Sequence, residues 1–248
     1  MHDPPTDVDR SPVGVVGEPT TVPASVREHA ATVYDEPAAV LESDPGLVIA
    51  VGEAAVLDLH EADVGVPILP VEAGAGLGSV PSSELERFPA LLEADLDFVD
   101  RRSLAATVGG IQHRVLLDVV LMTDEPARIS EYTVFREGRS IDRFRADGIV
   151  ITTPAGSTGY ARAAEGPVLA PGTDVVAAVP IAPFAIDTDA WILPAGSLAV
   201  RVERDDTAVE VRLDGRAGTI IGSGETVEIR PAGTVTFATT ALSRPFFD

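Results

Sequence analysis

The most constraining feature of this chain is a change in the order of its apolar segments near residue 100. Before that point, apolar segments at residues 47–51 and 66–71 alternate with a stretch of helical pattern at 54–61. After it, strand-like segments separated by turn signals such as LDGRAG and GSGET follow one another to residue 239. Alternating strands and helices favour a parallel sheet, whereas uninterrupted strands favour a sandwich.

We therefore predict a fold that combines an α/β part with an all-β part. Residues 1–11, which are polar and contain proline, are expected to form a disordered tail. Residues 12–100 are expected to form a small parallel α/β domain of nucleotide-binding type. Residues 101–248 are expected to form a β-rich, sandwich-like domain with one short helix after Tyr160. In the first part, helices are also predicted at 24–33, 36–42 and 82–94.

The charge of the chain limits its partners. Its 39 acidic and 18 basic residues give a formal net charge of −21. So negative a surface disfavours nucleic acid and anionic membranes. Concentrated salt would screen the self-repulsion, so the composition favours a halophilic protein, with codon bias alone as the alternative.

Missing residue types narrow the chemistry further. The sequence contains no Lys, no Asn and no Cys. A Schiff base, a Walker lysine, disulfides and cysteine–zinc sites are therefore excluded. The histidines show no metal-ligand spacing, and no apolar run is long enough to span a membrane. A cytoplasmic location is expected.

One segment predicts a ligand site. Residues 148–152 are Ile- and Val-rich and suit a buried strand, which Pro154 would end. Gly156 permits a tight turn, and Ser157 or Thr158 can cap the short helix that follows. A strand, a small-residue turn and a helix start direct free N–H groups at one point, which favours an anion or a polar ligand.

Residues 153–160 of this segment, TPAGSTGY, resemble the signature Thr-Pro-x-Gly-Ser-Thr-x-Tyr of the NAD kinases, and we call them the signature segment. Other matches to the family follow in the same order, from about residue 103 onward: RADG at 145–148, EGPVLAPG at 165–172, VPIAPFAI at 179–186 and LDGR at 213–216.

Other positions depart from the family pattern. The apolar segment at 47–51 is followed by Gly52, Glu53 and Ala54, where the family has Gly-Gly-Asp-Gly-Thr. Ala54 takes the place of the Asp that acts in the family as general base, so no catalytic residue of this motif is intact. The family's Asn-Glu pair is Leu117–Asp118, its glycine loop is EAGAGLGSV at 72–80, and its final Gln is Arg216.

The resemblance implies a dinucleotide site made by ten residues: Asp118, Arg128, Arg145, Asp147, Ala155, Gly156, Ser157, Thr158, Gly159 and Tyr160. The signature segment would supply backbone contacts, the Thr158 hydroxyl and the Tyr160 ring. Asp118 would accept ribose hydroxyls, and Asp147 a base or amide group. The two arginines would meet phosphates with a bidentate fork.

Each of these residues also has a local alternative. Asp147 could cap a turn, Asp118 could be an outward strand residue, and Arg128 could pair with Glu131 on the surface. Taken with the order of the motifs, the sequence favours the dinucleotide site.

The family activity transfers the γ-phosphoryl of ATP, with Mg²⁺, or of polyphosphate, to the adenosine 2′-hydroxyl of NAD and gives NADP. NAD kinases are homo-oligomers, so a dimer or tetramer is expected, with NAD(H) or NADP(H) as ligand. The alternative is a pseudoenzyme that binds the dinucleotide as a sensor or regulatory subunit. Glu53 or Asp58 could replace the missing base, or could simply be solvated acids at a helix start.

Overall fold

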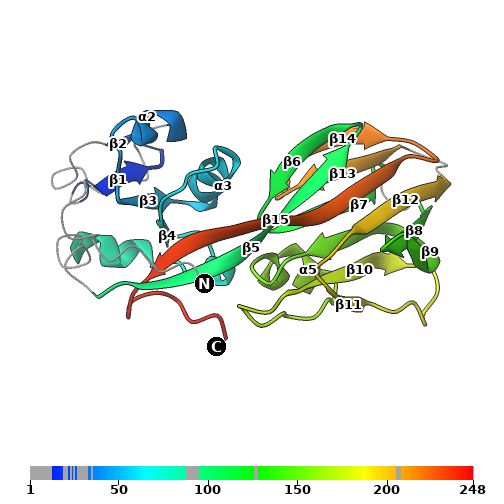
Figure 1. The fold of residues 1–248 in the computed structure, drawn as a ribbon. Coiled ribbons are helices and arrows are strands. Elements are labelled where there is room, and N and C mark those ends of the chain that lie inside the picture. Colours follow the sequence, from blue (N-terminus) through cyan, green and yellow to red (C-terminus); the bar gives the residue numbers. More distant parts are fainter. Residues whose placement is uncertain are drawn as a thin grey trace. The chain divides into compact units, whose positions relative to one another are not determined.

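The chain forms two compact units that are joined by two long strands. The computed structural model describes residues 13–18, 22, 24, 26, 33–34, 36–87, 95–125, 128–204 and 208–247, so the predicted tail lies outside it. Unit 1 comprises Met1–Arg101 with Val235–Asp248, and unit 2 comprises Arg102–Thr234. Strands β5 (Asp97–Val108) and β15 (Thr226–Thr239) each run from one unit into the other (Figure 1).

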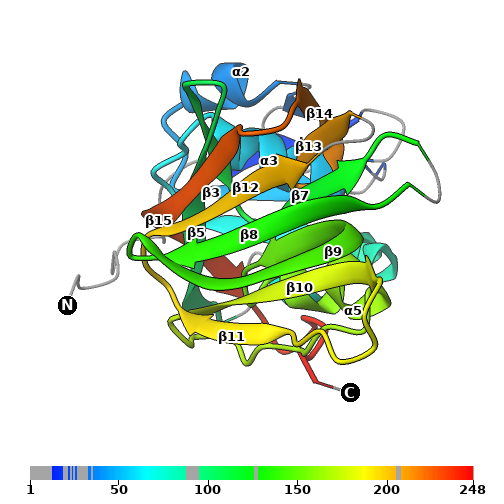
Figure 2. The same cartoon turned by 90° about the vertical axis from the view of Figure 1, so that its right-hand side faces the viewer.

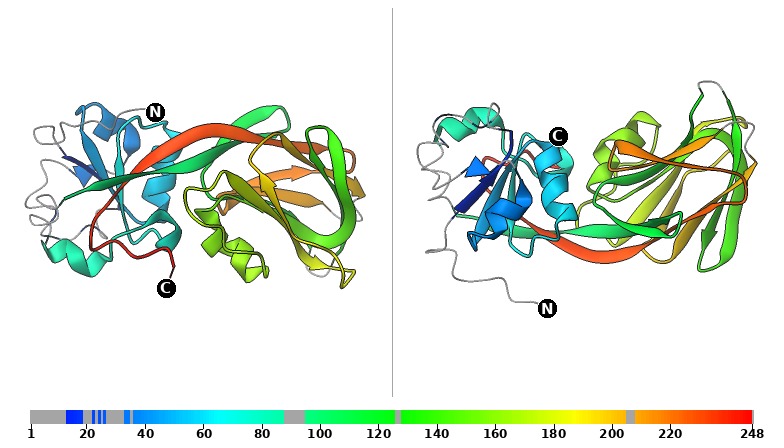
Figure 3. Two further views of the ribbon diagram at one scale, coloured as in Figure 1. Left: turned by 60° about the horizontal axis from the view of Figure 1, so that its bottom comes forward. Right: turned by 90° about the horizontal axis from the view of Figure 1, so that it is seen from above.

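Unit 1 contains a parallel sheet with the strand order β2-β1-β3-β4-β15, seen from two directions in Figure 3. The strands before β15 are β1 (Val13–Val16), β2 (Val33–Tyr34), β3 (Leu47–Val51) and β4 (Ile68–Val71). All five residues of β3 are buried, as expected for a parallel strand covered on both faces. Val51 pairs with Val71, so β3 and β4 end side by side.

The helices of unit 1 pack against this sheet. Helix α2 (Pro37–Leu41) contacts β1 and β2, and α3 (Glu53–Glu61) contacts β3 and β4. Two 3₁₀ turns, η2 (Ala75–Leu77) and η3 (Ser82–Arg87), follow β4. The helix predicted at 82–94 begins as η3, and residues 88–94 lie outside the described part, as does most of the helix predicted at 24–33.

Unit 2 is a β-sandwich in which β9 belongs to both sheets. One sheet has the order β11-β10-β9-β8-β12-β15, which Figure 2 shows in succession, and the other has the order β9-β7-β13-β14. A hairpin of β5 and β6 adds to the unit. The remaining strands are β6 (Ile111–Val115), β7 (Asp118–Thr123), β8 (Ser130–Arg136), β9 (Arg139–Thr152), β10 (Val175–Pro183), β11 (Trp191–Pro194), β12 (Leu198–Arg204), β13 (Val209–Leu213) and β14 (Arg216–Ile221).

Strand β9 reverses its faces where it passes between the sheets. Phe144 and Ala146 belong to the main core, and so do Ile149 and Ile151, so the buried residues change from even to odd positions. The change falls at Asp147 and Gly148. A Cβ at Gly148 would collide with the carbonyl of Leu121 on β7, so only glycine fits this crossing.

The predicted fold class, an α/β part with an all-β sandwich, is confirmed by this architecture. The chain nevertheless does not divide in simple sequence order. Residues 235–248, expected in the second domain, belong to unit 1, because Phe237 of β15 pairs in parallel with Ile68 of β4. The strand predicted at 112–121 is two strands, β6 and β7, with Leu116 and Leu117 between them.

Candidate functional site

The segment between β6 and β7 is held by a carboxylate from a distant hairpin. Asp214 lies in the turn between β13 and β14 with a positive φ of 52°. Its Oδ2 accepts the N–H of Leu116 at 2.9 Å, and its Oδ1 accepts those of Leu117 at 2.7 Å and Asp118 at 3.1 Å. Burial raises the pKa of the Asp214 carboxyl, and the three amide hydrogen bonds act in the opposite direction. We call residues 116–118 the anchored segment.

The anchored segment in turn holds the start of the signature segment. The N–H of Thr153 donates to the carbonyl of Leu117 at 2.9 Å, and its hydroxyl donates to the carbonyl of Leu116 at 2.7 Å. That hydroxyl also accepts the N–H of Gly156 at 3.2 Å. A Cβ at Gly156 would lie 2.7 Å from Thr152 Oγ1 and closer still to the Leu117 carbonyl, so glycine is required by close approach.

Ser157 stabilises the loop instead of capping a helix. It is fully buried, its hydroxyl donates to the carbonyl of Pro154 at 2.8 Å, and it accepts the N–H of Leu169 at 3.0 Å. The segment forms a 3₁₀ turn, η4 (Gly156–Thr158), and then the single helical turn α5 (Tyr160–Ala163). Neither has a side-chain cap, because the N-cap residues are Ala155 and Gly159, which carry no polar side chain.

The signature segment exposes only its last residues. Thr158 is half-buried, and Gly159 and Tyr160 are exposed, the tyrosine by 42%. Ala155 is buried at the other end of the segment. Asp118, at the start of β7, is paired in register with Thr152 at the end of β9. The structure therefore brings Asp118 and residues 155–160 together at one end of unit 2.

The other three predicted site residues lie at or beyond the far end of β7, where Met122 pairs with Gly148 of β9. Asp147 is half-buried on β9, and the five steps from it to Thr152 span about 17 Å at about 3.3 Å per residue. Arg145 is exposed and its guanidinium stands 5.3 Å from the Phe184 ring centroid. Arg128 precedes β8, and its carbonyl accepts the Thr123 hydroxyl at 2.9 Å at the far end of β7. The ten residues thus form two groups.

The local alternatives are resolved differently for each residue. Arg128 pairs with Glu125 at 3.2 Å, whereas Glu131 pairs with Arg143 at 2.8 Å. Asp147 lies within a continuous strand and not in a turn. Asp118 is only 6% exposed, so it is not an outward surface residue.

In unit 1, the segment aligned with the phosphate motif lies at the carboxyl end of β3. Gly52 has a positive φ of 91° and donates its N–H to the carbonyl of Val71 at 2.7 Å. Glu53 and Ala54 then begin α3, and both are exposed. The carboxyl ends of adjacent parallel strands are a usual place for ligands in α/β sheets. Ala54, which the resemblance places where the family has its catalytic Asp, nevertheless carries only a methyl group.

The glycine-rich loop at residues 72–80 is bonded to Arg244 of the C-terminal segment. Glu72 accepts the N–H of Ser82 at 2.7 Å and pairs with Arg244 at 3.0 Å. The backbone bond from Ser82 and then the charge of Arg244 hold the pKa of Glu72 below its ordinary value. The N–H of Arg244 also donates to the carbonyl of Ser79. Glu72, which would repel a phosphate, is therefore matched by a cation of the same unit.

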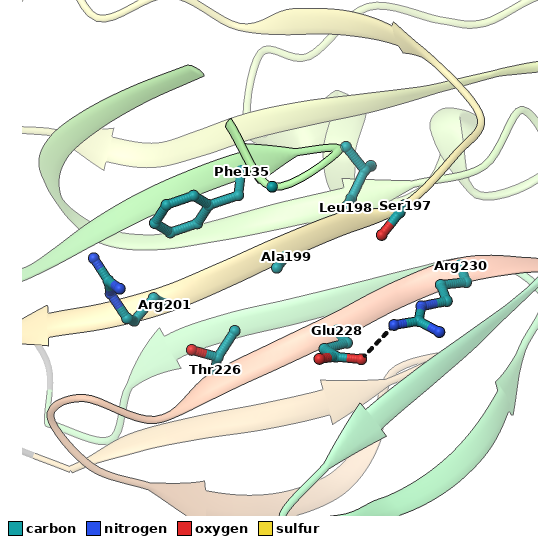
Figure 4. A pocket seen from close by; sticks show the side chains of 9 residues that line it. Phe135, Ser197, Leu198, Ala199, Arg201, Thr226, Glu228 and Arg230 are labelled. Atoms are coloured by element: carbon teal, nitrogen blue, oxygen red, sulfur yellow. Dashed lines mark hydrogen bonds and ion pairs between the residues drawn. The ribbon is translucent and has the colours of Figure 1, made fainter. Parts of the chain in front are cut away.

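A shallow pocket of about 270 Å³ lies on the outer face of β8, β12 and β15 (Figure 4). Ala199 forms a low point between the longer side chains of Phe135 and Glu228. The two arginines that line the pocket already pair with carboxylates, Arg201 with Glu203 and Arg230 with Glu228. No predicted site residue lines it, so it does not extend the site described above.

Across the described ranges, no group of three or more His, Cys, Asp or Glu side chains could hold a metal ion. Among the same residues, no helix is long and apolar enough to cross a membrane.

The chain is similar in sequence to known proteins. A family model described as the ATP-NAD kinase C-terminal domain matches residues 116–238. The NAD kinase of Citrifermentans bemidjiense is 33% identical over 222 residues, which cover 84% of this chain and 77% of that protein. The NAD kinase of Methanosphaera stadtmanae is 36% identical over 137 residues, which cover 54% and 50%.

Solved structures share the fold at low sequence identity. An NAD kinase from Archaeoglobus fulgidus in complex with ATP has a TM-score of 0.72 at 20% identity, covering 92% of this chain and 94% of that one. Yeast NADH kinase complexed with NADH has a TM-score of 0.72 at 15% identity, covering 94% and 84%. The fold is thus that of kinases acting on nicotinamide dinucleotides. With the sequence identities above, the chain belongs to the NAD kinase family.

Proposed function

We propose that unit 2 binds an NAD-type dinucleotide and that phosphoryl transfer by this chain is weak or absent. The observation that carries the binding proposal is the position of Asp118 beside the signature segment. Asp118 belongs to the anchored segment, which also bonds Thr153 at the start of the signature segment. A carboxylate there can accept ribose hydroxyls, as acidic residues do in other dinucleotide sites. The exposed Tyr160 would offer a ring face, whereas the N–H of Gly159 is already bonded to the carbonyl of Gly156 at 2.9 Å.

The proposal of weak transfer rests on Ala54. A positioned general base contributes about 10²- to 10⁴-fold to the rate, and a methyl group cannot act as one. Asp58 lies four residues further along α3 and so on the same face, with about 6 Å between the Cβ atoms. A base must lie within about 3 Å of the proton it removes, so this displacement argues against a direct replacement. Glu53 precedes Ala54 and points from another side of the helix.

The family's donor is ATP with Mg²⁺, which proteins bind through one or two carboxylates and the substrate phosphates. On helix α3, Glu53 and Asp58 are the first carboxylates after the Gly52 turn and could supply such an oxygen. These residues fit a weak metal–nucleotide site better than a dedicated one. Bound Mg²⁺ would neutralise phosphate charge, and the Gly52 turn would allow close approach of phosphate to the backbone.

If transfer is absent, the dinucleotide site would serve a sensor or a regulatory subunit.

The net charge of −21 supports a protein adapted to a concentrated-salt cytoplasm, because salt screens repulsion among carboxylates. Assays should therefore be made in high salt.

We also propose a homo-oligomer. Asp147 lies about 17 Å along β9 from Thr152, Arg145 lies two residues further, and Arg128 lies beside Thr123 at the far end of β7. One compact site within one chain therefore does not gather all ten residues. A second copy could present this group to the first copy's signature segment. Light scattering at low and high protein concentration tests this, and a monomer that binds dinucleotide fully would contradict it.

Two assays on the purified chain test the function. Calorimetric titration with NAD⁺, NADH, NADP⁺ and NADPH should show saturable binding of at least one of them. A coupled assay for NADP⁺ formation should show turnover that is very slow or undetectable. Rapid turnover would contradict the interpretation of Ala54, and no binding of any of the four would contradict the site.

A further inference from the structure

We propose that Asp214 is a positioning residue of the dinucleotide site, which acts on the ligand through Asp118 and the signature segment. The inference rests on the proposed function, because it assigns a further residue to the same site. Asp214 is separated from the anchored segment by 96 to 98 positions in the sequence, yet it accepts three consecutive backbone N–H groups there.

The hairpin does not itself need this carboxylate. An Asp-Gly pair forms a tight turn because both residues tolerate positive φ, and here φ is 52° at Asp214 and 71° at Gly215. The backbone therefore makes the turn, while the side chain leaves it to bind the anchored segment. Its role lies in holding residues 116–118.

The geometry requires a carboxylate in particular. An ionised carboxylate has two acceptor oxygens and no donor, so it can satisfy all three N–H groups. An asparagine of the same shape has one acceptor oxygen and an NH₂ group that would face the donors. The change Asp214→Asn therefore preserves size but sets an NH₂ donor against the N–H of Leu116, which then keeps only its longer contact of 3.2 Å to Oδ1.

The contacts continue from Asp214 to the signature segment in two steps. The first step fixes Leu116, Leu117 and Asp118. The second joins the carbonyls of Leu116 and Leu117 to Thr153, whose hydroxyl accepts the N–H of Gly156. Rotation of the anchored segment would therefore move the Asp118 carboxylate and the signature segment together.

A displacement of about 1 Å can cost about 10²-fold where a site depends on orientation. We expect Asp214→Asn to weaken dinucleotide binding about 10-fold or more. The matched control is Glu210→Gln in the same hairpin, because Glu210 bonds Arg212 and the N–H of Gly218 instead of the anchored segment. That control should bind within about 2-fold of the wild type.

A double-mutant cycle separates positioning from a general loss of structure. If Asp214 acts through Asp118, Asp214→Asn should weaken binding much less in an Asp118→Ala background than in the wild type. Amide hydrogen exchange of Leu116, Leu117 and Asp118 should also be faster in Asp214→Asn. Fully additive effects on affinity would overturn the inference.

The outcomes distinguish this inference from the proposed function. If the wild type binds none of the four dinucleotides, the proposed function fails and the inference fails with it. If the wild type binds and folded Asp214→Asn binds equally well, only the inference is overturned. Should Asp214→Asn fold poorly, Thr153→Val tests the second step of the same contacts, and wild-type affinity in that variant would overturn the inference.

Discussion

Asp118 and Asp214 each donate a backbone N–H to the other residue, although they are 96 positions apart in the sequence. The Asp118 N–H donates to the Asp214 carboxylate at 3.1 Å, and the Asp214 N–H donates to the Asp118 carbonyl at 2.9 Å. This reciprocal pair connects the turn of β13 and β14 to the start of β7. It explains how an irregular segment between two strands can hold the Asp118 carboxylate in one orientation.

Asp118→Asn should weaken dinucleotide binding. A hydrogen bond to a charged group contributes about 1.5–3 kcal/mol, so a loss of roughly 10- to 100-fold in affinity is expected. Calorimetry on both proteins measures it. Asp142→Asn on β9, whose carboxylate accepts the N–H of the next residue, is a suitable control. Equal affinities of Asp118→Asn and the wild type would show that this carboxylate does not contact the ligand.

Gly156→Ala should destabilise unit 2 by about 1–3 kcal/mol, because the new methyl group collides with the Leu117 carbonyl and Thr152. Urea denaturation measures the change in the free energy of unfolding. Gly65→Ala is the control, because nothing lies within 4 Å of a Cβ there. Equal stability of the two variants would contradict the close packing described for the signature segment.

Ala54→Asp alone should not produce an efficient kinase. It restores a carboxylate at the aligned position, but Glu53, Ala55 and Leu117 also depart from the family pattern. We expect the rate of NADP⁺ formation to stay within about 10-fold of the wild type, against the 10²- to 10⁴-fold that a positioned base supplies. A larger increase in the coupled assay would show that Ala54 is the sole lesion.

The Glu72 carboxylate should stabilise unit 1 only when it is ionised. Its pKa is lower in the folded protein than its ordinary value of 4.5, so its contribution is present above that value and is lost as the pH falls through the folded pKa. Glu72→Gln should therefore destabilise unit 1 near neutral pH, by less than about 1 kcal/mol because the pair with Arg244 is partly exposed. Denaturation at several pH values measures the difference, which should shrink in acid. A difference that grows in acid would contradict this account.

Much of the fold could be predicted because its local patterns agree with its long-range packing. The fully apolar segment Leu47–Val51 is a buried parallel strand, and the residues 54–61 of helical pattern lie in α3. The return of β15 to unit 1 could not be predicted, because the pairing of Phe237 with Ile68 leaves no local signal in either segment.

The site was predictable in part for the same reason. The signature segment follows β9 as its pattern indicates, but the hydroxyl of Ser157 serves packing and not a helix cap. The sequence predicts Asp214 only as part of the turn LDGRAG. Its three N–H partners lie on a segment far away in the sequence, so only the structure connects them. The distance of about 17 Å between Asp147 and Thr152 likewise depends on both residues lying in one continuous extended strand, β9.

The most direct test of the central claim is a crystal structure of the chain grown in high salt with a dinucleotide that it binds. We predict density for the ligand against the Asp118 carboxylate and residues 158–160. Density bound elsewhere on the chain, with Asp118 and Tyr160 untouched, would contradict the account.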